Sequence, residues 1–299
     1  MHEAIRALDE IRPLRDPILI GAFTGFTDAP GAATHTVDYL VKQWVATPFA
    51  ELDPERFYDF TVQRPRVRLE HGERVLDWPA NRIYLASPVG ATRDVLLMTG
   101  QEPHLRWRTF CDAILEVLRE TGSTTSVTLG AQPAGVPHTR PLPVSLSASH
   151  EEFETLFGLK APASRYQGQT GIVGVLNLQL RAQGWKNASL WAMAPHYLTV
   201  GPNPHIATAL VRLVDRALGT STPVGPLTEE AEQFDEQVRQ VVAESDEAAA
   251  YVRQLEEQYD SSRPALPPGA PETPAEDLPP TPEILDDLER FLREQRKGD

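Results

Sequence analysis

Three regularly spaced glycines are the first residues in this sequence whose arrangement suggests chemistry. Gly168, Gly171 and Gly174 lead into an apolar segment with helical periodicity that reaches Arg181. Free backbone N–H groups at the start of such a helix bind phosphate or another anion. The spacing is not G-x-G-x-x-G, and no G-x-x-x-x-G-K-[ST] occurs. A tight turn and close helix packing are therefore the favoured interpretation, with anion binding at Gly171 and Gly174 as the alternative.

A carboxylate follows the first strongly apolar run of the chain. Residues 17–23 read PILIGAF, which predicts a strand buried on both faces, and Asp28 comes shortly afterwards with Gly25 and Thr27. Open α/β sheets bind ligands at the carboxyl ends of their strands, so these three residues are candidates for a ligand site. Asp28 is equally suited to cap the helix predicted at 32–41, and capping is the favoured role.

A second carboxylate occupies the same position after another predicted strand. Residues 94–98 read DVLLM, and Gln101 and Glu102 follow them. Glu102 is accordingly the best candidate for a general acid or base in this sequence, with Gln101 as a possible ligand contact. The alternative is that Glu102 caps the helix that begins near Pro103, whose ring suits a first helical turn.

Other catalytic arrangements are missing from the sequence. The single cysteine, Cys111, has no histidine neighbour and lies among apolar residues, which is typical of a small buried side chain. No G-x-S-x-G, H-x-x-x-H or H-E-x-x-H pattern occurs. We therefore expect no cofactor, no metal site and no assigned catalytic residue, which favours a non-enzymatic protein.

The charge distribution indicates which partners and which cellular compartment to expect. The formal net charge is −14, and residues 227–299 carry 20 acidic and 7 basic side chains, which leaves 22 acidic and 21 basic upstream. A chain without basic excess gains little from binding nucleic acid or anionic lipid, so we expect neither as a partner. The charged N-terminal segment lacks the apolar centre of a signal peptide, which favours a cytoplasmic location.

Strand and helix patterns alternate along most of the chain, which predicts an α/β sheet covered on both faces. The runs that predict strands are 17–23, 44–49, 57–62, 67–69, 75–76, 82–86, 94–98, 123–129, 144–148 and 188–194. Those between 57 and 76 surround a turn at His71-Gly72 and suggest a peripheral antiparallel section. Residues 130–143, with His138 and Arg140, predict a long loop, and long loops beside a sheet often carry function.

Beyond residue 227 the pattern changes to a heptad seam with acidic flanks. Apolar or small residues alternate steps of four and three between 228 and 259, so the segment is either one long helix or a helical hairpin restarting at Ser245-Asp246. An apolar stripe must be buried on its own domain or on another chain. In the second case its partner-binding residues are Phe234, Val238, Val241, Val252 and Leu255.

The last part of the sequence divides into a linker and a short helix. Eight prolines fall between Pro264 and Pro282, where neither helix nor central strand is expected. Residues 283–299 predict an amphipathic helix whose apolar face offers Ile284, Leu288, Phe291 and Leu292 to a partner. The expected organisation is an α/β core at 1–226, an acidic helical region at 227–260, a linker at 261–282 and the helix at 283–299.

Four blocks together resemble the proteasome assembly chaperone 2 family, in its bacterial, actinobacterial-type form. They are PILIGAFTGFTD at 17–28, TGQEP at 99–103, TGIVGVLN at 170–177 and YVRQLEEQYD at 251–260. The resemblance implies a three-layer α/β/α sandwich similar to the phosphorylase/hydrolase fold, with a C-terminal helical extension. It also implies assembly into homo-oligomers, often trimers.

Better understood members of that family bind the α-ring of the proteasome core, often through a C-terminal hydrophobic-tyrosine-any-residue tail. This sequence ends Lys297-Gly298-Asp299 and departs from that pattern. The first hypothesis is therefore a non-enzymatic, homo-oligomeric scaffold or chaperone that binds protein partners, with proteasome α subunits as one possibility. The alternative is an enzyme acting on a nucleoside-like or phosphorylated ligand, with a pocket where Asp28, Glu102 and the 171–174 turn converge.

Overall fold

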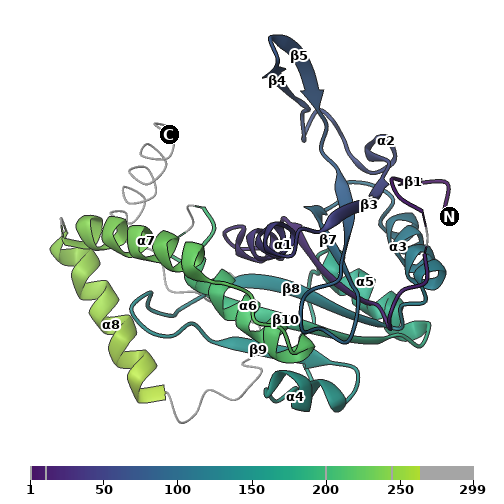
Figure 1. Ribbon diagram of the computed structural model, residues 1–299. Helices are drawn as coiled ribbons and strands as arrows, with labels where there is room; N and C mark the ends of the chain where they lie inside the picture. Colours follow the sequence, from purple (N-terminus) through teal and green to yellow (C-terminus); the bar gives the residue numbers. More distant parts are fainter. Residues whose placement is uncertain (1, 11, 199–200, 244, 263–299) are drawn as a thin grey trace.

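A mixed sheet forms the centre of the protein (Figure 1). The computed structural model describes residues 2–10, 12–198, 201–243 and 245–262. Within them the main sheet has eight strands in the order β1-β3-β6-β7-β2-β8-β10-β9. The strands are β1 (Ile5–Ala7), β2 (Ile18–Thr24), β3 (Thr47–Leu52), β6 (Asn81–Ala86), β7 (Val95–Gln101), β8 (Thr125–Ala134), β9 (Val144–Ala148) and β10 (Lys186–Pro195).

The four central strands β7, β2, β8 and β10 run parallel, and their neighbours β6 and β9 run antiparallel to them. Strand β2 is buried along its length apart from Thr24. Its side chains alternate between two cores, because Ile18 and Ile20 face one layer and Leu19 and Phe23 face the other. This is the double burial that the continuous apolar run predicts.

Helices cover both faces of the sheet. One layer contains α1 (Ala32–Gln43), α4 (Glu152–Phe157) and α6 (Pro204–Leu218), and the other contains α3 (Trp107–Thr121) and α5 (Ile172–Ala182). The predicted three-layer α/β/α architecture with C-terminal helices is therefore confirmed.

Several local predictions were wrong. Residues 57–62 do not form a strand, because Asp53 caps the short helix α2 (Pro54–Phe57) by accepting a hydrogen bond from the Glu55 N–H at 3.1 Å, and turns follow it. Strand β8 continues to Ala134, inside the predicted loop 130–143, since its ladder with β10 extends to Ala134 and Pro195. Helix α4 had no prediction, because six residues give too little periodicity.

Strands β4 (Arg66–Glu70) and β5 (Glu73–Asp77) form a separate antiparallel hairpin, which we call the β-arm. It projects from the body of the protein beyond α2 and β3 (Figure 1). The peripheral antiparallel section expected around His71-Gly72 is thus present.

Helices α7 (Gly225–Ala243) and α8 (Asp246–Ser262) form a helical hairpin, which decides between the two predicted arrangements of the heptad seam. The chain turns at Ser245, whose hydroxyl accepts a hydrogen bond from the Ala248 N–H at 3.1 Å. A side chain that caps α8 in this way stabilises a new helix start over continuation of α7.

Among the described residues, no helix combines the length and the apolar content that crossing a membrane requires.

A buried polar network fastens α5 to the sheet. The Asn177 amide on α5 donates to Thr128 Oγ1 at 3.0 Å on β8 and to Ser189 Oγ at 2.7 Å on β10. Asn187 in turn donates to Asn177 Oδ1 at 3.0 Å. Because all four side chains are buried, each depends on the others for its hydrogen bonds.

We expect Asn177→Ala to lower the free energy of unfolding by about 1–3 kcal/mol, since it removes three hydrogen bonds from the buried side chains of Thr128, Ser189 and Asn187. Chemical denaturation measures this change. The matched control is Leu178→Ala, an exposed position on the same helix, which should change stability by less than about 0.5 kcal/mol. Equal losses in the two variants would contradict the role of the network.

Candidate functional site

Three segments far apart in the sequence meet at the carboxyl ends of β2 and β7. The turn after β2, Glu102 after β7 and Gly171 before α5 are in contact, because a Cβ built at Gly171 would lie 2.7 Å from Thr27 Cγ2 and 2.8 Å from Glu102 Oε1. These segments approach so closely that position 171 has no room for a side chain, which explains the glycine. The structure thus brings together Gly25, Thr27, Glu102 and Gly171.

The Glu102 carboxylate lies at the N-terminus of α5. Its Oε1 accepts a hydrogen bond from the Ile172 N–H at 2.6 Å, and its Oε2 accepts one from the Phe26 N–H at 3.4 Å. An anion at this position is stabilised by the free N–H groups and by the helix dipole. The place that a bound phosphate would take at α5 is thus held by a carboxylate of the protein itself.

Asp28 is a buried cap for α1. Its carboxylate accepts hydrogen bonds from the Ala33 N–H at 2.6 Å and from the Thr34 N–H at 3.2 Å. Burial raises the pKa of Asp28, while these hydrogen bonds act in the opposite direction. Asp28 therefore holds the first turn of α1 against the end of β2, as its capping interpretation predicts.

The remaining candidates near this edge have structural contacts. The Gln101 amide donates to Gln63 Oε1 at 3.0 Å, and the Gln101 carbonyl accepts from the Tyr58 hydroxyl at 2.9 Å. A Cβ built at Gly174 would lie 1.9 Å from Thr170 Oγ1, so this glycine permits the entry turn of α5. Cys111 is fully buried, and burial raises the pKa of its thiol to about 12.

We expect Glu102→Ala to lower the free energy of unfolding by about 0.5–2 kcal/mol, because the α5 N-terminus loses its cap and its countercharge. Glu102→Gln keeps an acceptor without the charge and should lose less. Thermal and chemical denaturation measure both variants, with the exposed Glu229→Ala as control. If Glu102→Ala unfolds with the same midpoint as the original protein, the capping role is wrong.

The described part of the heptad seam packs against other residues of the same chain. The α7 and α8 side chains pack against Tyr197 and Leu198, which follow β10. The buried members from the seam are Phe234, Val238, Val252 and Leu255, with Val241 half-buried beside them. These five predicted partner-binding residues therefore fill an intramolecular core, which is the first of the two alternatives for the stripe.

The candidates in the last segment lie outside the described residues. They are Ile284, Leu288, Phe291 and Leu292. Of the predicted linker 261–282, the first two residues belong to the last turn of α8, and the rest is also outside the described ranges.

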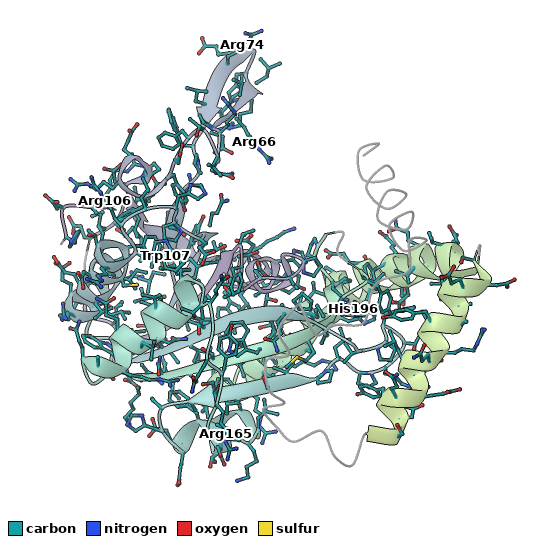
Figure 2. All side chains as sticks on the ribbon, turned by 180° about the vertical axis from the view of Figure 1, so that it is seen from behind. Arg66, Arg74, Arg106, Trp107, Arg165 and His196 are labelled. Carbon is teal, nitrogen blue, oxygen red and sulfur yellow. The ribbon has the colours of Figure 1, made fainter. Side chains whose placement is uncertain are left out.

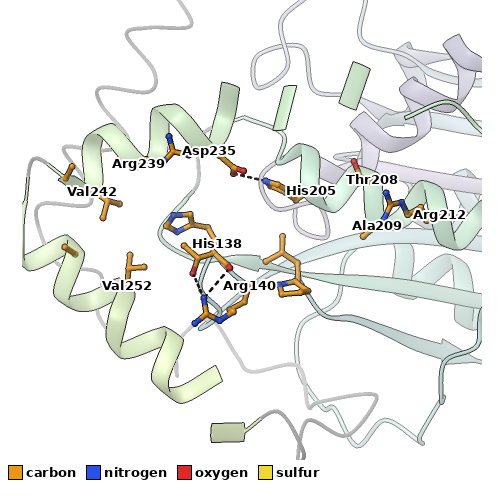
Figure 3. A pocket seen from close by; sticks show the side chains of 15 residues that line it. His138, Arg140, His205, Thr208, Ala209, Arg212, Asp235, Arg239, Val242 and Val252 are labelled. Carbon is orange, nitrogen blue, oxygen red and sulfur yellow. Dashed lines mark hydrogen bonds and ion pairs between the residues drawn. The ribbon is translucent and has the colours of Figure 1, made fainter. Parts of the chain in front are cut away.

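A groove of about 720 Å³ lies beside the helical hairpin (Figure 3). Its walls come from α6, α7, α8 and the segment 138–142. Apolar side chains such as Leu142, Val242 and Val252 line it together with polar ones, including His205 and Asp235. This size and mixture are typical of sites that bind a ligand or a peptide side chain.

Ion pairs hold the walls of this groove together. The Arg140 guanidinium pairs with Glu256 at 3.1 Å and with Asp260 at 2.9 Å, which ties the segment 138–142 to α8. The Tyr259 hydroxyl donates to the Pro141 carbonyl at 2.7 Å. On the other side, His205 Nε2 and Asp235 Oδ1 lie 2.7 Å apart and link α6 to α7. The walls of the groove are thus fixed by contacts within the chain.

Two histidines lie under the helical hairpin. His138 Nδ1 lies 2.8 Å from the Tyr197 hydroxyl, and His196 Nε2 lies 2.9 Å from the Tyr251 hydroxyl. Burial lowers the pKa of both histidines below the usual 6.5. Both are consequently neutral in the folded protein at pH values where the unfolded chain begins to bind protons.

We expect the free energy of unfolding to fall as the pH decreases from about 7 to about 5. The unfolded chain binds protons at histidine near pH 6.5, whereas the lowered pKa of His138 and His196 delays protonation in the folded state. Their contribution is fully present above pH 6.5 and is lost below it. Denaturation at a series of pH values should give a shallower slope for His138→Gln combined with His196→Gln; an unchanged slope would exclude these residues as its source.

The sequence pointed to only some of the residues that line the groove. His138 and Arg140 stood out because they lie in a turn-rich segment between strands. His205 and Asp235 gave no signal, because each lies in an ordinary helical pattern and they meet only when α7 folds back over α6. Within the described residues, no group of three or more histidine, cysteine, aspartate or glutamate side chains is arranged to hold a metal ion.

Comparison with known proteins assigns the chain to a family. The sequence profile of the PAC2 family matches residues 22–242, which include the end of β2, the strands from β3 to β10, both helical layers and nearly all of α7. The protein therefore belongs to the PAC2 family, and the resemblance noted in its sequence is confirmed. No curated protein matches the chain significantly.

Solved structures agree with this assignment. A proteasome-assembly chaperone homologue of Mycobacterium tuberculosis is 41% identical, with a TM-score of 0.70 over 79% of this chain and 99% of that one. A PAC2 family protein of Streptomyces avermitilis is 37% identical, with a TM-score of 0.71 over 79% of this chain and 100% of that one. An archaeal proteasome activator of Pyrococcus furiosus shares the fold at 20% identity, with a TM-score of 0.64 over 79% and 97% of the two chains.

Proposed function

We propose that this protein is a non-enzymatic, homo-oligomeric scaffold or chaperone of the cytoplasm that binds protein partners, with proteasome α subunits as the first candidates. The observation that carries the proposal is membership of the PAC2 family, together with 41% identity to a proteasome-assembly chaperone homologue. A chaperone-like role follows from the family. The identity of the partner, the homo-oligomeric state and the cytoplasmic location are the proposed part.

The sheet edge supports this reading over an enzymatic one. The Glu102 carboxylate already accepts a hydrogen bond from the Ile172 N–H at the start of α5, and Asp28 accepts from the Ala33 and Thr34 N–H groups of α1. A phosphorylated ligand at this edge would have to displace a carboxylate from a favourable site and would be repelled by it. The residues that were candidates for chemistry are therefore better explained as caps.

The C-terminal segment is the proposed contact with the partner. Phe234, Val238, Val252 and Leu255 are buried within the chain and Val241 is half-buried, so the seam offers little apolar surface to a second protein while the helical hairpin is closed. The amphipathic helix predicted at 283–299 follows a proline-rich sequence, a composition that predicts a semi-rigid spacer. An amphipathic helix on such a spacer binds by laying its apolar face in a groove of the partner.

We expect Leu288→Asp combined with Phe291→Asp to reduce capture of proteasome α subunits at least tenfold, since two apolar anchors of the stripe become charged. Capture is measured with the full chain immobilised and α subunits from the same cell in solution. The matched control, Arg290→Ala with Arg293→Ala, changes the opposite face of the predicted helix and should bind as the original protein does.

Two outcomes would count against the proposal. If the original protein captures no α subunit while remaining folded, the proteasomal partner is wrong. If both double variants bind equally well, the apolar stripe is not the contact surface.

A further inference from the structure

The heptad seam continues without a break through the turn between α7 and α8. Its members alternate steps of four and three from 234 to 259, and the steps from Val241 to Ser245 to Ala248, which span the turn, keep the same spacing. This spacing places all members on one side of a single continuous helix. The seam therefore fits a continuous helix as well as it fits the hairpin.

The turn also lacks the residues that commonly end a helix. Helices α3, α4 and α6 end at Gly122, Gly158 and Gly219, each in the left-handed conformation that stops a helix. Residues 240–250, by contrast, contain neither glycine nor proline. The new helix start depends on the Ser245 hydroxyl, which caps α8. The local sequence therefore opposes a continuous helix with little more than this cap.

Helix α8 covers a surface of the body that we call the α8 seat. It is formed by residues 136–142, Met193, residues 196–198 and the inner face of α7. Figure 2 shows His196 below α7, on the side of the body toward α8. The apolar side chains that α8 contributes to the packing on this seat are Ala248, Val252, Leu255 and Tyr259.

Polar contacts at the edge of the seat fix the position of α8. Arg140 pairs with Glu256 and Asp260, and the Tyr251 hydroxyl lies 2.9 Å from His196 Nε2. Each of these contacts joins a side chain of α8 to a residue outside α8. An identical seat on a second copy of the chain consequently offers all of them.

The body of the protein keeps its cores when α8 leaves the seat. Among the described residues, the two cores of the sheet contain no side chain from α8. Departure of α8 uncovers the apolar cluster around Tyr197 and Leu198, which must then be covered again to exclude water. The α8 of another copy fits every contact of the seat, because it carries the same side chains at the same spacing.

We propose that copies of this protein exchange α8, so that α7 and α8 become one continuous helix and the α8 of each copy occupies the α8 seat of a neighbour. This inference rests on the homo-oligomer of the proposed function and names the surfaces that join its copies. Exchange of an identical element is a low-cost route to an oligomer, because the contacts between copies are those that a single chain makes with itself.

The difference in free energy between the closed and the exchanged forms lies in the turn, since the contacts of α8 with its seat are the same in both. A hairpin creates two additional helix ends, which leave backbone groups without intrahelical partners. A continuous helix restores these hydrogen bonds and gives up the Ser245 cap. A higher protein concentration shifts the equilibrium further toward the exchanged form.

Cross-linking between chains tests the exchange. Thr139 in the seat donates a hydrogen bond to Glu256 of α8 at 2.5 Å, and the single cysteine, Cys111, is buried. A chain with Thr139→Cys and a chain with Glu256→Cys are produced together in one cell and treated with a short bismaleimide. We expect a covalent dimer on a denaturing gel, because exchange places the α8 of one chain on the seat of the other.

The control for this cross-link uses Gln254→Cys in place of Glu256→Cys. Position 254 is exposed on the far side of α8 and should give no dimer. Each single variant produced alone should also give none. Without exchange, positions 139 and 256 meet only within one chain, so the mixed chains would stay separate.

A proline at position 246 tests the continuous helix. Asp246 is exposed and is the first residue of α8, a position that proline favours. Inside a continuous helix the same proline removes a hydrogen bond and breaks the helix. We expect Asp246→Pro to be monomeric by light scattering, with the 33.1 kDa of one chain, and Asp246→Ala to keep the mass of the original oligomer. Circular dichroism checks that both variants are folded.

The possible results separate this inference from the proposed function. An oligomeric protein whose mixed cysteine variants give no covalent dimer overturns the exchange and leaves the homo-oligomer and partner capture intact. A folded Asp246→Pro variant with the original oligomeric mass overturns it as well. A monomeric original protein overturns both the exchange and the proposed homo-oligomer.

Discussion

The central strands of the sheet are buried on both faces, and the rest of the structure depends on this constraint. Strand β2 sends Ile18 and Ile20 into one core and Leu19 and Phe23 into the other, so both layers of helices are needed to exclude water from it. The two layers in turn bring α5 and α1 to the same edge of the sheet, where their N-termini meet the ends of β2 and β7. The contacts between these helix N-termini and strand ends follow from this packing.

At this edge of the sheet, two carboxylate side chains of the protein lie at helix N-termini. In many α/β proteins the free N–H groups at such helix starts bind a ligand. Here Glu102 accepts a hydrogen bond from the Ile172 N–H of α5, and Asp28 accepts from the Ala33 and Thr34 N–H groups of α1. Glu102 also accepts from the Phe26 N–H in the turn after β2, so it joins three segments that are distant in the sequence. The sheet edge where other α/β proteins bind ligands is thereby used to stabilise the fold.

The features that remain available to other molecules lie at the two ends of the protein. One end carries the β-arm with its exposed apolar face, and the other carries a groove whose walls are joined by the pairs Arg140–Glu256 and His205–Asp235. Neither is needed to complete the two cores of the sheet.

The sequence by itself determined the central architecture and most of its elements. Continuous apolar runs predicted the parallel strands, and the four quoted blocks identified the family, because each of these signals is contained in a short window. The heptad seam likewise predicted helices, but its pattern is the same for one long helix and for a hairpin. The tertiary structure decided for the hairpin, since the apolar stripe is buried only when α7 and α8 fold over Tyr197 and Leu198. The partners of Glu102, and the pair His205–Asp235, were likewise decided by tertiary structure, because contacts between residues dozens of positions apart depend on how whole layers pack and leave no trace in local periodicity.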